Sequence, residues 1–93
     1  MDEELKTAEA AKTAIDTQST APLSRATITI LREAVRAAMP MTILSSEGPL
    51  NEARHNVVIA LSGLIDGPLT EAMIDKAKRE VEDWIKRLRE APT

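Results

Sequence analysis

Three stretches of this chain, residues 21–26, 48–53 and 67–72, share one pattern that predicts the start of a helix. Each places a proline and a leucine ahead of Ser, Asn or Thr. The side-chain oxygens of these three residue types accept hydrogen bonds from the free amides of a first helical turn. The pattern divides the chain into helical segments and predicts an all-α fold.

The predicted caps are Ser24, Asn51 and Thr70. Ile28 and Ile74 lie four positions after the first and third caps, and a leucine precedes each of those caps. This spacing is that of a hydrophobic staple, in which two apolar side chains fix the angle at which the chain enters the helix. His55 occupies the corresponding position after the second cap, so the staple is absent there.

Residues 2–17 are rich in Ala, Glu and Lys, which favour helices, and the first residues are acidic, as the dipole of a helix prefers. The apolar stripe of this segment has only two large side chains: Leu5, Ala8, Ala11 and Ile15. Docking this segment would therefore bury little apolar surface. We predict that residues 1–20 form a helical or flexible arm and linker, which frays or orders on a partner, and that residues 21–93 form the bundle domain.

The second helix is predicted from residue 25 to residue 39, where Pro40 ends it. Residues 26–30 alternate like a strand, but the preceding cap and the helical period of residues 31–38 favour a helix. One arc of about 60° carries Ile28, Leu31 and Val35, and the arc beside it carries Arg25, Thr29, Arg32 and Arg36. The second arc is thus a basic face with three arginines.

Residues 39–48 mix apolar side chains with helix breakers. They predict an ordered loop that closes one end of the bundle or, alternatively, a hydrophobic lip for a partner. The third helix is predicted from residue 52 to residue 65, before an Asp-Gly-Pro stop. Ile59 lies opposite the apolar arc of this helix, which indicates a central helix or one partly covered by another chain.

The fourth helix, residues 71–90, has the cleanest pattern. Its apolar residues recur at alternating spacings of three and four, as in a heptad seam: Ile74, Ala77, Val81, Trp84 and Leu88. Its other face pairs acids with bases four residues later, for example Asp83 with Arg87. The sequence therefore predicts a small three-helix bundle, to which the N-terminal arm adds a fourth helix where it docks.

Composition excludes several classes of function. The 93 residues include no cysteine and one histidine, which excludes disulfides, thiolate metal sites and multi-histidine sites within one chain. Trp84 is the sole aromatic residue, which argues against binding single strands by base stacking. No apolar run approaches the roughly 20 residues of a membrane span, and the first residues are acidic where a secretory signal is basic. The net charge of −3 is that of a small acidic protein, which we expect in the cytoplasm.

The sequence also lacks the common catalytic motifs. It contains no phosphate-binding glycine loop, nucleophile elbow or zinc-protease helix. His55 and Ser62 lie two helical turns apart, a spacing that arises often without catalysis. Most acids have a basic neighbour at helical spacing, which indicates solvated ion pairs rather than acid–base catalysts. We therefore expect no enzyme, no metal and no cofactor.

These observations predict a non-enzymatic protein–protein interaction module, such as a small adaptor, inhibitor or assembly subunit. We expect it to associate with itself as a homodimer or higher oligomer, to bind another protein, or both. The expected contact residues are Met39, Met41, Ile43, Leu44, His55 and Ile59. The alternative is a small DNA-binding regulator that presents Arg25, Arg32 and Arg36 to phosphates. The net negative charge argues against nucleic acid, and the acidic start of the fourth helix argues against a helix-turn-helix. An accessory subunit of a larger enzyme fits the sequence as well as the interaction module does.

Overall fold

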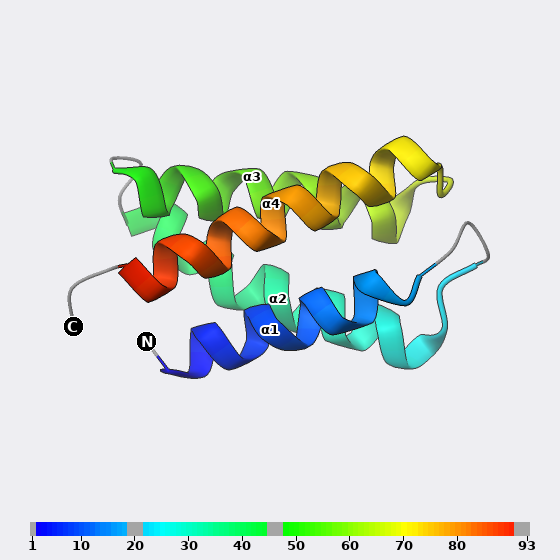
Figure 1. Cartoon of the computed structure of the whole chain (residues 1–93), viewed down its shortest axis with the longest axis horizontal. Coiled ribbons are helices and arrows are strands. Elements are labelled where there is room, and N and C mark those ends of the chain that lie inside the picture. Colours follow the sequence, from blue (N-terminus) through cyan, green and yellow to red (C-terminus); the bar gives the residue numbers. More distant parts are fainter. Residues whose placement is uncertain (1, 19–21, 45–47, 91–93) are drawn as a thin grey trace.

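The computed structural model describes residues 2–18, 22–44 and 48–90, without the side chains of residues 2 and 40–44. These residues form four helices: α1 (Asp2–Asp16), α2 (Arg25–Leu44), α3 (Pro49–Asp66) and α4 (Glu71–Glu90). The helices alternate in direction, so that α1 and α3 point one way and α2 and α4 the other (Figure 1). α1 and α3 each pack against both α2 and α4, and they lie diagonally opposite each other. The all-α fold is confirmed, and it is a four-helix bundle.

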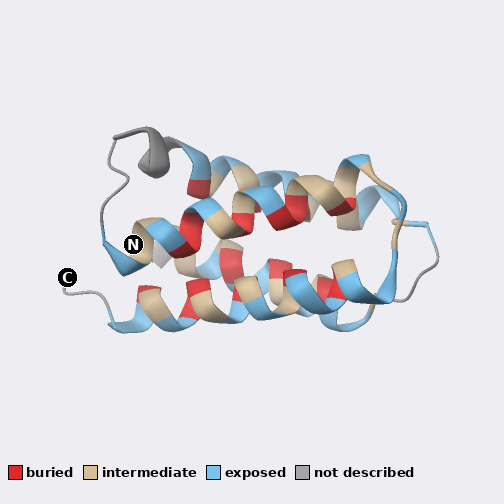
Figure 2. Cartoon of the chain, turned by 90° about the horizontal axis from the view of Figure 1, so that it is seen from above, coloured by how far each residue is buried: buried red, intermediate tan, exposed pale blue. Residues whose placement is uncertain are grey.

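Each helix turns one stripe of side chains toward the centre of the bundle, where Figure 2 shows the buried residues. The predicted seam of α4 is confirmed because all five of its residues are buried: Ile74, Ala77, Val81, Trp84 and Leu88. They form one core cluster with residues that include Leu31 of α2 and Val57 and Leu61 of α3. The heptad spacing thus identified the side of α4 that faces its neighbours.

Two of the three predicted helix caps are confirmed. Ser24 Oγ accepts a hydrogen bond from the amide of Thr27 at 3.1 Å, and Thr70 Oγ1 accepts one from the amide of Met73 at 3.1 Å. The prediction that Asn51 caps the third helix is wrong, because α3 already begins at Pro49. Proline suits a first turn because the amide hydrogen it lacks would have no partner there. Gly48 precedes it with a φ of 95°, which an L side chain rarely adopts.

The prediction that Pro40 ends the second helix is also wrong, because α2 continues to Leu44. A proline inside a helix removes one hydrogen bond and crowds the preceding turn, which weakens or bends the helix without always ending it. The backbone of residues 39–44 is therefore helical where a loop was expected. Residues 45–47 of that predicted loop lie outside the described residues.

α1 packs into the bundle through the small stripe that the sequence indicated. Ala8, Ala11 and Ile15 are buried, and Leu5 is partly buried against the core. Alanines allow close approach of neighbouring helices, but they bury little apolar area. Polar contacts supply part of the attachment of this helix, and they begin with Glu4.

Candidate functional site

Glu4 forms the centre of a buried polar cluster that joins three helices. Its carboxylate accepts two hydrogen bonds from the guanidinium of Arg54 in α3, from Nε at 2.7 Å and from Nη2 at 2.8 Å. The same carboxylate accepts a hydrogen bond from the indole Nε1 of Trp84 in α4 at 2.9 Å. Arg54 is 4% exposed and Trp84 is fully buried. The third nitrogen of the guanidinium, Nη1, donates to Asn51 at 2.7 Å, so the buried cation is well satisfied.

The residue patterns in the sequence did not predict this cluster, although two signals pointed to it. Arg54 lies one turn before Val57 on the side of α3 that carries the apolar arc. Trp84 lies in the core seam, and a buried indole N–H requires an acceptor. A charged residue on an apolar arc and a tryptophan in a seam together predict a buried acid nearby. The spacing of residues could not identify that acid, because Glu4 is 50 residues from one partner and 80 from the other.

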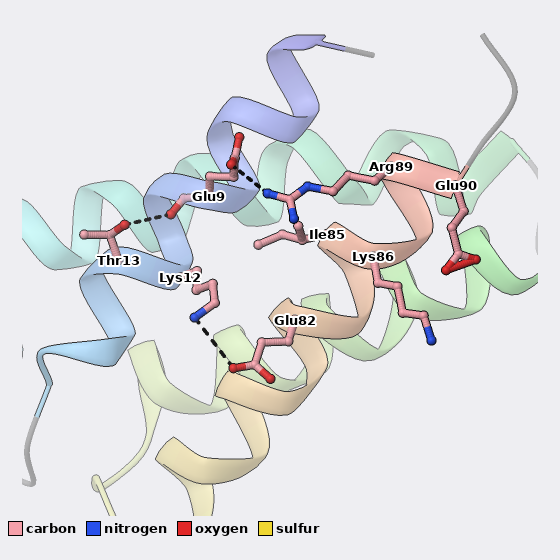
Figure 3. Close-up of a pocket in the computed structure, with 8 residues that line it drawn as sticks. All are labelled: Glu9, Lys12, Thr13, Glu82, Ile85, Lys86, Arg89 and Glu90. Carbon is pink, nitrogen blue, oxygen red and sulfur yellow. Dashed lines mark hydrogen bonds and ion pairs between the residues drawn. The ribbon is translucent and has the colours of Figure 1, made fainter.

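A groove of about 460 Å³ lies between α1 and α4, lined by Glu9, Lys12, Thr13, Glu82, Ile85, Lys86, Arg89 and Glu90 (Figure 3). Two ion pairs cross it, Arg89 to Glu9 at 3.1 Å and Lys12 to Glu82 at 3.6 Å. Lys12 also donates a hydrogen bond to Asp16, which is the main cause that raises the pKa of the Lys12 ammonium above its ordinary value. The groove therefore uses most of its charges within the chain, and its lining resembles no acid–base or phosphate site.

The three arginines of α2 form an exposed row along the outer side of the bundle. Arg25, Arg32 and Arg36 are all exposed, as the predicted basic arc requires. Arg36 pairs with Glu33 of the same helix at 3.7 Å, and both side chains remain mostly in solvent. Among the described residues, Arg25 and Arg32 have no ion pair within 4 Å. Arg36 also lines a pocket with Glu3, Glu4 and Thr7 of α1, so this end of the arginine row borders α1.

Of the predicted contact residues, the described ones are exposed on the adjacent helices α2 and α3. Ile59 of α3 is 54% exposed and Met39 of α2 is 41% exposed, and these are the large hydrophobic residues left most open in the described part of the chain. His55 is also exposed, one turn before Ile59. The side chains of Met41, Ile43 and Leu44 lie outside the described residues. α3 is therefore an outer helix of the bundle, and Ile59 points away from the core.

The residues of α3 that face solvent on its outer side form a row, which we call the outward row of α3. Its exposed residues are Glu52, His55, Ile59 and Asp66. This row is acidic at its two ends and apolar near its middle. We call the arginine row with Met39, together with the outward row of α3, the α2–α3 face, although Arg36 at one end of the row also borders α1.

The described part of the chain contains no group of three His, Cys, Asp or Glu residues placed to hold a metal ion. Its helices are too short or too polar to cross a bilayer. No known protein family matches this sequence, and neither the curated proteins nor the solved structures include a significantly similar chain. The function must therefore be inferred from the surfaces of the bundle.

Proposed function

We propose that this protein is a non-enzymatic interaction module that associates with itself through the α2–α3 face. The observation that carries the proposal is Ile59, which is 54% exposed at the middle of an otherwise polar outer row. Isoleucine is a weaker helix former than the alanines, leucines and lysines used elsewhere in the chain. Helix formation therefore does not explain an isoleucine at this position, whereas a contact does.

The apolar gain is modest for each residue and adds up across a symmetric contact. Burying the exposed half of Ile59 contributes about 1 kcal/mol per copy, and Met39 adds a similar amount. In a twofold dimer, each residue contributes once from each copy. These four side chains together contribute about 4 kcal/mol, so a micromolar dimer, which needs roughly 8 kcal/mol, also requires contacts from the rest of the face.

The size of the bundle leaves room for these further contacts. The molecule measures 38 × 21 × 18 Å along its principal axes. One long side therefore offers on the order of 700 Å² to a partner, against roughly 800 Å² per partner in a standard protein interface. The α2–α3 face is large enough for a specific dimer of moderate stability.

Sedimentation of the full chain across a concentration series tests the proposal. We expect the wild type to shift from monomer to dimer in the micromolar range. Ile59→Lys should remain monomeric, because the contact would then have to bury an ammonium group. Its unfolding free energy should change by no more than about 1 kcal/mol, since the position is exposed in the single chain.

Ala10→Lys is a matched control, because Ala10 is exposed on α1, away from the α2–α3 face. It adds the same charge and should leave dimerisation unchanged. A wild type that stays monomeric at high micromolar concentration would refute self-association. Tight, salt-dependent binding of duplex DNA that is lost on replacing the arginine row would instead favour a DNA-binding regulator.

A further inference from the structure

The two helices of the α2–α3 face carry opposite charges on their outer sides. The arginine row lies on α2, whereas the outward row of α3 has Glu52 and Asp66 at its ends. Within the described residues, no ion pair links α2 to α3. These charges are solvated in the single chain and can pair across an interface. The face is therefore complementary to itself rather than uniformly basic.

The packing of α2 against α3 fixes which residues lie at the same height. The two helices run antiparallel, and Ile28 lines one pocket with Leu64 and Ile65. From that level, both helices advance about 1.5 Å per residue in opposite directions. Arg25 therefore lies level with the Asp66 end of α3. Ile59 lies level with the stretch between Arg32 and Arg36.

We propose that two copies dock with α2 of each antiparallel to α3 of the other, about a twofold axis parallel to the helices. This inference rests on the proposed function. Rotation about an axis parallel to the helices leaves each residue at the same position along them, so Arg25 faces Asp66 of the partner subunit. The aliphatic stems of Arg32 and Arg36 flank Ile59 of the partner subunit, while their charged ends reach solvent.

Charge selects this arrangement over the other symmetric one. A twofold axis perpendicular to the helices would place α2 against α2 of the partner subunit. The two arginine rows would then face each other, and like charges opposed in an interface are strongly unfavourable. Docking α2 on α3 instead pairs unlike charges twice, once on each side of the axis.

Complementation between two charge-reversed variants of the full chain tests the arrangement. In a dimer of Arg25→Asp, each new aspartate faces Asp66 of the partner subunit, and in a dimer of Asp66→Arg each new arginine faces Arg25 of the partner subunit. Each variant alone should therefore dimerise on the order of tenfold more weakly than the wild type. In a mixture, one copy of each forms a heterodimer with both contacts complementary. We expect the mixture to associate with nearly wild-type affinity.

Both reversals suit the fold of the single chain, because an acid at the start of α2 and a base at the end of α3 each favour the helix dipole. Arg79→Asp, on the exposed side of α4, is the control and should not change dimerisation. A wild-type dimer that Ile59→Lys disrupts, but whose charge-reversed variants do not complement each other, would overturn this arrangement and leave the proposed function standing. A monomeric wild type would overturn both.

Discussion

The two long sides of the bundle use their charges in opposite ways. On the α1–α4 side, Lys12–Glu82 and Arg89–Glu9 cross the seam between the helices. Glu4 extends the same pattern into the core, where it reaches Trp84. On the α2–α3 side, no ion pair crosses between the helices within the described residues. Charge thus holds one side of the chain together and remains available on the other.

This difference follows from the apolar content of the helices. The buried stripe of α1 consists mainly of alanines, so polar contacts supply part of its attachment. The fully buried stripe of α2 is similar, with Leu31 beside Ala34 and Ala38, but α2 adds the partly buried Ile30 and Val35. Its neighbour α3 supplies the buried Val57 and Leu61, so more apolar area joins these two helices. Charges that the fold does not use can serve recognition, which is the basis of the proposal for the α2–α3 face.

Removal of the buried acid should have the largest effect on stability. Glu4→Ala leaves the guanidinium of Arg54 without its carboxylate and the indole of Trp84 without an acceptor. We expect the free energy of unfolding to fall by about 3–5 kcal/mol, as when one partner of a buried ion pair is removed. Urea denaturation followed by the fluorescence of Trp84 measures the change.

Glu3→Ala is the matched control, because Glu3 is the exposed neighbour on the same helix. Its effect should stay within about 0.5 kcal/mol. If both substitutions cost equally little, the buried cluster does not attach α1, and the contrast between the two sides is lost.

Truncation of the α4 seam should have the next largest effect. Val81→Ala or Leu88→Ala removes apolar atoms from the core and should lower the free energy of unfolding by about 2–4 kcal/mol. Arg79→Ala, on the exposed side of α4, should change it by less than about 0.5 kcal/mol. Thermal and chemical denaturation should both show a larger loss of stability for Val81→Ala and Leu88→Ala than for Arg79→Ala. Equal effects at the three positions would contradict the assignment of the seam.

Local patterns in the sequence predicted most of the fold. The caps at Ser24 and Thr70 and the seam of α4 depend on residues within a few turns of one another, where spacing is informative. The end of α2 was mispredicted, because whether a helix continues past Pro40 depends on the packing around it rather than on the proline alone. The start of α3 was mispredicted because Pro49 competes with Asn51 for the first turn.

In the candidate site, the exposed residues could be predicted from local patterns, whereas the buried polar cluster could not. The exposure of Ile59 and of the arginine row could be predicted, because Ile59 lies opposite the apolar arc of its helix and the arginines form a separate arc beside the apolar arc of theirs. The cluster of Glu4, Arg54 and Trp84 could not be assembled, because it requires knowing that α1 lies beside α4 and diagonal to α3. The sequence alone left open whether the first helix docks at all.

The smallest expected effects distinguish the two sides most directly. Arg89→Ala removes the ion pair with Glu9 and should lower the free energy of unfolding by about 0.2–1 kcal/mol at low salt. Arg32→Ala removes no ion pair and introduces a better helix former, so unfolding of the monomer should be unchanged or slightly less favourable. Denaturation at a concentration below dimerisation, in low and in high salt, measures both variants. Salt should remove the effect of Arg89→Ala and leave Arg32→Ala as it was. If Arg32→Ala instead destabilises the monomer as much as Arg89→Ala does, and salt removes that effect too, the arginine row supports the fold of the single chain. Its charges would then not be available to a partner.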